Sequence, residues 1–386
     1  MPISFLDLRR QHEEVGGEVS AAVERVLAAG NYILGREVEA FEREWARFCG
    51  VRSCAGVGNG TDALALALLA SGAVRPGRRD EVITAPLTAG YTALAVSNAG
   101  GVPAFADIDP ETYTLDPRGL ERALTPRTRA VVPVHLYGQM ADLEAVCDFA
   151  ARRGLFVVED AAQAHGARLA GRRAGAWGHA AAFSFYPTKN LGAYGDGGAV
   201  TSDDSNLIER VKELRQGGHP SALSGGVAGQ NSRLDELQAA ALRVKLRRLS
   251  DWNRRRRRLA SAYQRLLSRG PARGASRDAR RLVLPSERAL VLPSERAGAG
   301  SHVFHLYVVR HPERERLRAH LAARGIETLV HYPAPLHLQT LFRRRGRPSL
   351  PVAERAADEI LSLPLYPQLS DEEVREVAEA VLDFEG

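Results

Sequence analysis

The stretch FSFYPTKNLGAYGDGG, residues 183–198, carries the pattern on which the interpretation of the fold depends. Its first residues predict the end of a buried strand, and Lys189 follows in a loop rich in glycine. Glycines allow a ligand to approach the backbone closely. A lysine nucleophile must be desolvated so that it can lose its proton near neutral pH. The stretch therefore predicts a strand that leads into a lysine-bearing ligand site; the alternative is a surface lysine.

Short apolar runs alternate with helical patterns on both sides of this stretch. The expected strands are residues 81–85, 130–136, 155–159, 181–185 and 198–201, and the expected helices include residues 141–153 and 206–216. Continuous apolar strands that alternate with helices favour an α/β fold with a mostly parallel central sheet, covered by helices on both faces. Ligands of such sheets gather at the carboxyl ends of the strands.

The C-terminal third differs in pattern. Residues 233–267 have helical spacing without Gly or Pro. We expect this helix to leave a large domain, residues 1–245, and to enter a small α+β domain, residues 246–386. In the small domain we expect a strand at 302–310 and helices at 312–324 and 371–384. Residues 270–300 predict a mobile loop without a function of its own, in which the octapeptide LVLPSERA occurs twice, at 282–289 and 290–297.

The composition is that of a globular protein. The 386 residues include 52 Lys and Arg and 46 Asp and Glu, and 45% are hydrophobic, which excludes a disordered chain. The three cysteines lack zinc spacing and predict buried small residues in a reducing compartment. We expect no metal, no membrane span and a cytoplasmic location. Arginine runs at 254–258 and 343–347 predict a solvated helix face and a solvated loop. The alternative is attraction of a polyanion or a diphosphate-bearing substrate, but no nucleic-acid motif supports a nucleic-acid partner.

A second signal is VVEDAAQAHG, residues 157–166, in which Asp160 follows an apolar strand. A carboxylate in that position is unfavourable unless it has a cationic partner. A protonated pyridine nitrogen is a suitable partner, because the pair makes the ring an electron sink. The alternative is an aspartate that caps a helix.

A third signal is GVGNGTDALALALL, residues 56–69, in which small residues precede a helix that opens at Thr61. Free backbone N–H groups and the helix dipole make such a helix start an anion cradle. The spacing matches neither the P-loop nor the dinucleotide-binding motif. Alone, the stretch fits an ordinary capped helix equally well.

Together the three signals fit one cofactor, pyridoxal 5′-phosphate: a phosphate anchor, then an aspartate after a strand, then a lysine. With these residues the chain resembles the DegT/DnrJ/StrS-type nucleotide-sugar aminotransferases of aminotransferase fold type I. The resemblance covers nearly the whole chain. It rests on the motifs FLDL, GTDALALAL, DIDPETYTLDP, TPRTRAVVPVHLYGQMAD, VVEDAAQAHGA, FSFYPTKNLGAYGDGGAV, NSRLDELQAA, HVFHLYVVR, HYPAPLHLQ and LSLPLYP.

The resemblance implies roles at the cofactor ring. It implies that Lys189 forms the covalent link to the cofactor and that Asp160 pairs with the pyridine nitrogen. It also implies that Gln163 contacts the cofactor near its ring and O3′. Relatives commonly carry an aromatic residue that stacks on the ring, in a P-S-F-T-F-V-A-T run. Here PLTAGYT, residues 86–92, fits with one residue deleted and places Ala89 at that position. Tyr91 is a candidate for the stacking residue, and a packed helix residue is the alternative.

The resemblance also implies where the phosphate and the substrate bind. It assigns the phosphate to Gly60, Thr61 and Ser184. It implies that Asn231 reaches the phosphate of the neighbouring subunit's cofactor, which predicts a homodimer with shared active sites. It places a substrate group on the sugar-nucleotide side, namely Tyr186, His331 and Tyr332. His135, His165 and His305 are interpreted as satisfied residues of the core.

The implied activity is transfer of an amino group from L-glutamate or L-glutamine to a nucleotide-linked keto-deoxysugar in deoxyaminosugar and antibiotic biosynthesis. The F-Y-P-T-K form resembles enzymes that aminate carbon 3, which suggests a dTDP-3-keto-6-deoxyhexose. Carbon-4 relatives more often have His where this chain has Tyr186. Two other activities stay open: a sugar dehydratase, whose relatives typically replace the lysine with His, and a non-catalytic sensor or regulator.

Overall fold

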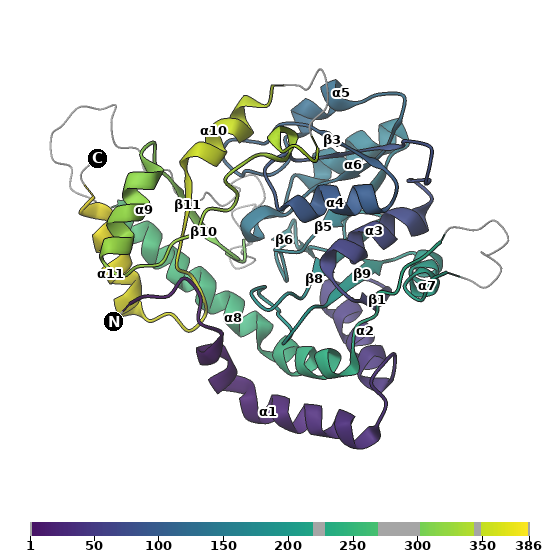
Figure 1. Cartoon of the computed structure of the whole chain (residues 1–386), viewed down its shortest axis with the longest axis horizontal. Coiled ribbons are helices and arrows are strands. Elements are labelled where there is room, and N and C mark those ends of the chain that lie inside the picture. Colours follow the sequence, from purple (N-terminus) through teal and green to yellow (C-terminus); the bar gives the residue numbers. More distant parts are fainter. Residues whose placement is uncertain (1, 219–227, 269–301, 343–348, 385–386) are drawn as a thin grey trace.

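The computed structural model describes residues 2–218, 228–268, 302–342 and 349–384. Its centre is a seven-stranded sheet in the order β1-β9-β8-β5-β4-β2-β3 (Figure 1). The strands are β1 (Ser53–Val57), β2 (Glu81–Thr84), β3 (Val102–Phe105), β4 (Thr128–Val132), β5 (Phe156–Asp160), β8 (Ala180–Ser184) and β9 (Gly198–Ser202). The pairs from β3 through β2, β4 and β5 to β8 are parallel, whereas β9 runs antiparallel to both β8 and β1. The mostly parallel sheet is confirmed.

Helices cover both faces of the sheet (Figure 1). In the N-terminal half they are α1 (Leu8–Ala29), α2 (Arg36–Cys49), α3 (Gly60–Ser71), α4 (Gly90–Asn98), η1 (Pro117–Gly119), α5 (Leu120–Ala123), η2 (Leu136–Gly138), α6 (Leu143–Arg153) and α7 (Ser205–Leu214). Side chains of α3, α4 and α7 pack in one cluster against one face. On the other face, α2 and α8 (Glu236–Ser268) pack over β8 and β9, and α6 packs over β4 and β5.

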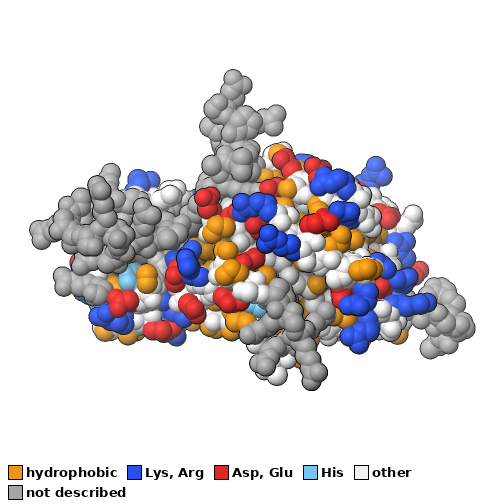
Figure 2. Space-filling view, turned by 90° about the horizontal axis from the view of Figure 1, so that it is seen from above, with side chains coloured by type: hydrophobic (Ala, Val, Ile, Leu, Met, Phe, Trp, Pro, Cys, Tyr) orange, Lys and Arg blue, Asp and Glu red, His pale blue; other side chains and the backbone are white. Residues whose placement is uncertain are grey.

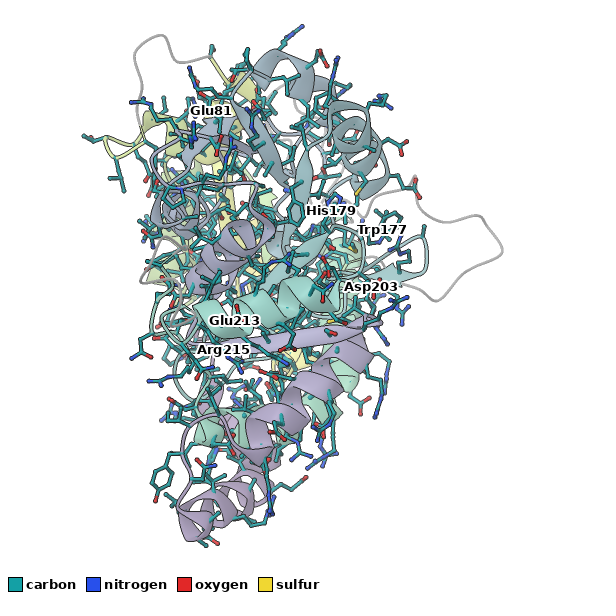
Figure 3. All side chains as sticks on the ribbon, turned by 90° about the vertical axis from the view of Figure 1, so that its right-hand side faces the viewer. Glu81, Trp177, His179, Asp203, Glu213 and Arg215 are labelled. Carbon is teal, nitrogen blue, oxygen red and sulfur yellow. The ribbon has the colours of Figure 1, made fainter. Side chains whose placement is uncertain are left out.

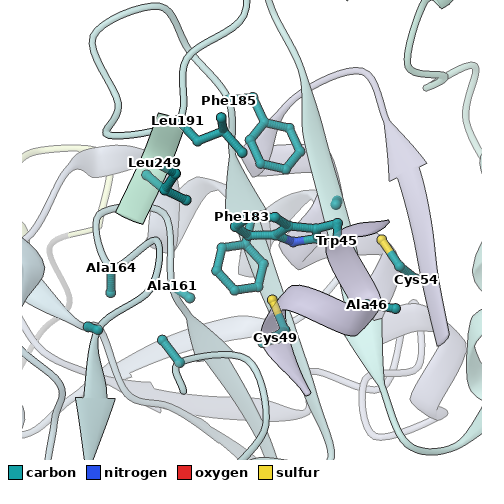
Figure 4. Close-up of a cluster of buried hydrophobic side chains, with 14 of the residues drawn as sticks. Trp45, Ala46, Cys49, Cys54, Ala161, Ala164, Phe183, Phe185, Leu191 and Leu249 are labelled. Atoms are coloured by element: carbon teal, nitrogen blue, oxygen red, sulfur yellow. The ribbon is translucent and has the colours of Figure 1, made fainter. Parts of the chain in front are cut away.

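Strand periodicity explains this two-sided burial. Val157 belongs to the cluster with α6, and its neighbour Val158 belongs to the cluster with α3, because successive side chains of a strand point to opposite faces. The same alternation sends Phe183 toward α2, where its ring meets Trp45 edge-on with centroids 4.9 Å apart (Figure 4). A sheet buried on both faces presents its strand ends, not its faces, to a ligand.

The C-terminal part packs around a two-stranded antiparallel sheet. Its elements are β10 (Tyr307–Arg310), α9 (Arg314–Ala323), η5 (Leu336–Leu338), α10 (Pro351–Glu359), β11 (Ile360–Leu363) and α11 (Asp371–Leu382). A small hairpin, β6 (Arg168–Leu169) with β7 (Arg172–Arg173), completes the strands. Helix α8 crosses the proposed boundary between residues 245 and 246, and its C-terminal end packs with α11. The division into two domains stays a prediction.

The structure corrects two strand expectations. The strand expected at 130–136 ends at Val132, because Pro133 has no N–H to donate and the chain then turns into η2. The strand expected at 302–310 begins only at Tyr307, because Phe304 has φ 45° and donates its N–H to the His302 ring. The loop expected at 270–300, with its octapeptides, lies outside the described residues.

A third correction concerns charge. The run 254–258 is not wholly solvated, because Arg256 is buried and donates to the carbonyls of Phe304, His305 and Leu365. Residues 343–347 lie outside the described part. Basic and acidic side chains are interspersed over the face seen in Figure 2. Cys49 and Cys54 are buried as expected, whereas Cys147 is only half-buried. No helix within the described ranges is long and apolar enough to cross a membrane.

Candidate active site

Two neighbouring parallel strands bring Asp160 and Lys189 to the same edge of the sheet. Asp160 is the last residue of β5 and stands opposite Ala182 of β8. Strand β8 ends at Ser184, and Lys189 follows in the next loop. Because parallel strands end at a common edge, residues separated by 29 positions in the sequence reach one place. This is the juxtaposition that the sequence predicts.

The loop that carries Lys189 is folded tightly on itself. The Lys189 N–H donates to the carbonyl of Tyr186 at 2.8 Å, and the Ala193 N–H donates to that of Phe185 at 2.7 Å. A Cβ atom added to Gly192 would lie 2.2 Å from the carbonyl oxygen of Pro187. Only glycine fits such a close approach of two backbone segments. The loop therefore holds the base of the lysine side chain in one place.

Burial tunes the Lys189 amine. Desolvation lowers the pKa of Lys189 from 10.5 to about 8, although the negative charge of Asp160 acts in the opposite direction. Burial disfavours the ammonium form because the charge loses its hydration. The neutral amine, which is the form that attacks a carbonyl, is then far more abundant near neutral pH than for an ordinary lysine.

The Asp160 carboxylate is buried, and its partners are neutral. Its Oδ2 accepts a hydrogen bond from the hydroxyl of Thr92 at 2.7 Å, and its Oδ1 accepts from the Ala162 N–H at 3.2 Å. Thr92 lies on the first turn of α4. Within the described ranges, no Lys, Arg or His nitrogen forms an ion pair with this carboxylate. A buried carboxylate without a cation is suited to receive one from a ligand.

The adjacent carboxylate has the opposite character. Glu159 is fully buried; its carboxylate accepts from the His135 ring at 2.9 Å and from three backbone N–H groups, those of Gly175, Trp177 and Gly178. Burial alone would raise the pKa of Glu159, but these hydrogen bonds hold it below its ordinary value. Glu159 is therefore a satisfied structural group, and Asp160 is the carboxylate of this strand that is available to a ligand.

The start of α3 forms a cradle beside the lysine loop. Asn59 caps the helix by accepting from the Asp62 N–H, and the helix begins at Gly60. A Cβ atom on Gly60 would lie 2.6 Å from the Ser184 side chain, and one on Gly198 would lie 2.3 Å from the Asn59 carbonyl. The N-terminus of α3 therefore lies directly against the end of β8. Its unpaired N–H groups and the Ser184 hydroxyl suit a phosphate.

Replacing Gly60 with alanine is expected to weaken cofactor binding. The new methyl group would push Ser184 away from the phosphate, at a strain of about 1–3 kcal/mol, and a loss of that size in the bound complex corresponds to about 5- to 150-fold in affinity. Gly17 is the control, because it also lies in a helix, a Cβ there has no atom within 4 Å, and it is far in sequence from the predicted site residues. Fluorescence titration of both apo-variants with pyridoxal phosphate checks this. Equal affinities of the two variants would contradict it.

Gln163 and Tyr332 meet on the C-terminal side of Asp160. The Gln163 Oε1 accepts from the Tyr137 N–H at 2.7 Å, and its Nε2 donates to the Tyr332 hydroxyl at 3.0 Å. The Tyr137 hydroxyl donates to the carbonyl of His331. These contacts join two parts of the chain that are 169 residues apart and bring three of the predicted residues together.

A buried chain of amides supports the lysine loop, and the sequence analysis did not identify it. Asn190, next to Lys189, donates to Asn253 of α8 at 2.9 Å and accepts from the His305 ring at 3.2 Å. Asn253 donates to the carbonyl of His165, whose ring donates to that of Ser184. His165 and His305 are thus core residues that contact the loop's surroundings. In the sequence, the position next to Lys189 was the one feature that could have indicated a role for Asn190.

Three predicted residues lie at the surface of the single chain. Tyr91 is 67% exposed and Tyr186 is 52% exposed, and Asn231 is also exposed. Thr61, in the first turn of α3, is half-buried. No metal-binding group of three or more His, Cys, Asp or Glu occurs in the part of the chain that the structure describes.

The site's chemistry fits pyridoxal phosphate. The cofactor needs an amine that is neutral near pH 7, an acid for its ring nitrogen and a cradle for its phosphate. Lys189 has the lowered pKa, Asp160 is buried without a cationic partner, and Gly60 leaves room beside Ser184. The three groups lie at adjoining strand and helix ends.

Comparisons with known proteins find relatives that match nearly the whole chain. A "pleiotropic regulatory protein" from Geobacillus stearothermophilus is 44% identical over 386 residues, covering 100% of this chain and 99% of the relative. The dTDP-3-amino-3,4,6-trideoxy-alpha-D-glucose transaminase of Streptomyces venezuelae is 46% identical over 384 residues, covering 99% and 96%. The crystal structure of S. venezuelae DesV in complex with a ketimine intermediate has a TM-score of 0.88 at 45% identity, covering 99% of this chain and 98% of that one.

The fold is that of fold type I pyridoxal-phosphate-dependent transferases, as the architecture and these neighbours show. The model of the DegT/DnrJ/EryC1/StrS aminotransferase family matches residues 13–382. That range includes every predicted site residue, from Gly60 to Tyr332. The chain therefore belongs to the DegT/DnrJ/EryC1/StrS aminotransferase family.

Proposed function

We propose that this aminotransferase transfers an amino group from L-glutamate or L-glutamine to a nucleotide-linked keto-deoxysugar, specifically a dTDP-3-keto-6-deoxyhexose. The observation that carries the proposal is the low-pKa amine of Lys189 beside the buried carboxylate of Asp160, which forms no ion pair within 4.0 Å among the described residues. The substrate class rests on the likeness to the S. venezuelae transaminase, whose name specifies a 3-amino sugar. The setting would be deoxyaminosugar and antibiotic biosynthesis.

Lys189 would be the group that moves the proton. The cofactor, when bound, supplies an electron sink and carries the amino group between the two substrates. The Nζ of Lys189 would take the proton from the α-carbon of the amino donor and deliver it within the same half-reaction, and it would move a proton in the opposite direction in the second half-reaction. Its pKa of about 8 suits both roles, because the amine is readily protonated and deprotonated near neutral pH.

Asp160 and Thr92 would act together at the ring nitrogen. The ionised Asp160 carboxylate would hold that nitrogen in its protonated form, which strengthens the electron sink. The Thr92 hydroxyl occupies one oxygen of the carboxylate at 2.7 Å and fixes its orientation. Orientation matters because a preorganised charge costs no reorganisation during the reaction. Thr92 would therefore be a positioning residue for Asp160.

Tyr332 and Gln163 would contact the cofactor's O3′ side and the bound sugar. Burial raises the pKa of Tyr332 to about 12, so the phenol keeps its proton at neutral pH. Its oxygen already accepts from Gln163, which leaves the O–H free to donate to a ligand. Burial also lowers the pKa of His331 to about 4, which keeps that ring neutral. Tyr186, on the exposed side of the loop, is the third proposed substrate contact, and Tyr91 is the proposed stacking residue.

The proposed acceptor is tested by half-reactions. Incubation with L-glutamate should convert the holoenzyme's absorbance to that of the aminated cofactor. Adding a dTDP-3-keto-6-deoxyhexose should restore the original spectrum, and the corresponding 4-keto sugar should do so more slowly. Faster restoration by the 4-keto sugar would indicate carbon-4 amination. No restoration by either keto sugar would contradict the proposed function.

We further propose that the enzyme is a homodimer in which Asn231 contacts the cofactor phosphate of the neighbouring subunit. Mixing Lys189→Ala and Asn231→Glu chains, each inactive alone, should then restore activity. A hybrid dimer has one site with both intact residues, so random reassociation gives about a quarter of the wild-type sites. Steady-state activity after joint refolding checks this. No recovery, with hybrid dimers present by mass, would contradict a shared site.

The regulatory relative keeps a second function open, because its similarity spans the whole chain. A regulator without catalysis would bind operator DNA in a gel-shift assay and fail the half-reaction test. A dehydratase is less well supported, because dehydratase relatives typically carry His in place of the lysine that this chain retains as Lys189. The cytoplasmic location and the absence of a nucleic-acid partner stay predictions.

A further inference from the structure

A group of three arginines lies at the edge of the sheet opposite to Lys189. Arg168, Arg172 and Arg173 belong to the β6–β7 hairpin, and all three line a cavity of about 260 Å³. The other lining residues include Cys49 and Gly50, which precede β1, and Asp203, which follows β9. Asp160 and Lys189 follow the carboxyl ends of β5 and β8. A strand of five residues spans about 16 Å, so the cavity is separate from the candidate active site.

The hairpin places like charges against each other. Arg168 and Arg173 are direct partners in the register of β6 and β7. Like charges directly opposite in an antiparallel pair destabilise it. Burial, followed by the charge of Arg168, lowers the pKa of Arg173 below its ordinary value. The arrangement is therefore unfavourable by itself, and a bound anion would remove the repulsion.

The protein does not neutralise these arginines with carboxylates. Arg168 donates to the carbonyl of Gly171 at 2.6 Å, Arg172 to that of Ala176 and Arg173 to that of Phe48. Within the described ranges, no Asp or Glu oxygen lies within 4.0 Å of their guanidinium nitrogens. Asp203 is a carboxylate that lines the cavity, and it accepts from the Arg52 N–H at 3.0 Å.

Aromatic rings hold two of the guanidinium groups in place. Arg172 lies over the Trp177 ring at 4.5 Å, and Arg173 lies over the Phe48 ring at 4.4 Å. Cation–π contacts and carbonyl hydrogen bonds fix long side chains that would otherwise be free in solution. Figure 3 shows Trp177 and Asp203 on the same side of the molecule. The cavity therefore presents preorganised, planar donors.

We propose that Arg168, Arg172 and Arg173 form a second, non-catalytic binding site for a small phosphate-bearing anion. Guanidinium groups suit this ligand, because their parallel N–H groups match the oxygens of a phosphate. The cavity volume of about 260 Å³ accommodates one or two phosphate groups. A second cavity of about 710 Å³ is lined by Trp177, Phe156 and His179, and Arg172 of the hairpin lies over that Trp177 ring.

Binding of pyrophosphate to the holoenzyme tests the site. The cofactor then fills the cradle at α3, and isothermal titration in phosphate-free buffer measures the remaining sites. The variant Arg168→Gln/Arg172→Gln should bind pyrophosphate at least about tenfold more weakly than wild type, because two charge-assisted contacts are lost. The control Arg122→Gln/Arg318→Gln removes two charges elsewhere and should bind as wild type does. Parallel titrations measure the affinities of inorganic phosphate and of a nucleoside diphosphate for wild type and variant. Among the compounds whose binding the variant weakens, the one that wild type binds most tightly indicates the class of natural ligand.

Thermal unfolding separates a ligand site from a structural role. Without pyrophosphate, Arg168→Gln/Arg172→Gln should melt at the wild-type temperature or above it, because repulsion is relieved. With pyrophosphate, wild type and the control should gain clearly more stability than the variant, whose remaining gain comes from the substrate site. The proposal is overturned if wild type binds no phosphate compound at millimolar concentration, if the variant binds as wild type does, or if the variant melts lower without ligand.

Discussion

Replacing Lys189 with alanine is expected to abolish transamination, with kcat lower by about 10³-fold or more. The variant loses the group that links the cofactor, and it loses a proton transfer that is typically worth about 10²–10⁴-fold. The amine's low pKa gives the wild-type enzyme a pH signature as well. The reactive fraction of Lys189 should rise as pH rises through about 8, instead of near 10.5 as for an ordinary lysine.

Steady-state kinetics and competitive amine labelling of the apoenzyme measure these two effects. Lys212→Gln is the matched control, since the ion pair of Lys212 among the described residues is an i,i+3 pair with Glu209 at the surface. Such pairs contribute about 0–1 kcal/mol, so the control should keep its activity. Methylamine should partly restore turnover to Lys189→Ala, because a small amine can supply the missing base. An active Lys189→Ala variant would disprove the assigned role.

Asp160→Asn is expected to lower kcat by about 10²–10³-fold with little change in melting temperature, because a charge that acts on the ring nitrogen is lost. The amide can still accept from Thr92. Glu159→Gln, one residue earlier on β5, should lower the stability of the fold and change kcat little. It removes the charge that accepts from the His135 ring and from backbone N–H groups, and a lost hydrogen bond to a charged group costs about 1.5–3 kcal/mol of unfolding free energy.

The pair Asp160→Asn and Glu159→Gln is compared by urea unfolding and by half-reaction rates. Stability from Glu159 is fully present above its ordinary pKa and is lost as pH falls through its lowered folded-state pKa, because the folded state binds the proton less readily. If Glu159→Gln lost activity without losing stability, the assignment of Glu159 as the structural carboxylate and Asp160 as the cofactor-binding carboxylate would be wrong.

The positions of Asp160 and Lys189 could be predicted from the sequence, because each depends only on the residues next to it. Asp160 and Lys189 each follow an apolar run, and parallel strands bring such positions to one edge. The sequence did not predict strand direction: residues 198–201 have the same apolar pattern as a parallel strand, yet β9 is antiparallel. Direction depends on the length and path of the connection, which periodicity does not contain.

Hydrophobic periodicity and short motifs also did not predict contacts between distant segments. Thr92 bonds to Asp160 across 68 positions, and Gln163 bonds to Tyr332 across 169. Neither hydroxyl carries a local signal that distinguishes it from an ordinary helix or loop residue. Arg256 is a similar case, because its arginine neighbours predict a solvated face and only tertiary packing supplies the three carbonyls that it binds.

The most direct test uses the chain's three lysines, Lys189, Lys212 and Lys245. Burial lowers the pKa of Lys245 to about 8 as well, so low pKa alone does not single out Lys189. The apoenzyme is incubated with pyridoxal phosphate at equal stoichiometry, reduced with borohydride and mapped by mass spectrometry. The account predicts one pyridoxyl group, on Lys189. A group on Lys245 or Lys212 instead, or no group at all, would contradict it.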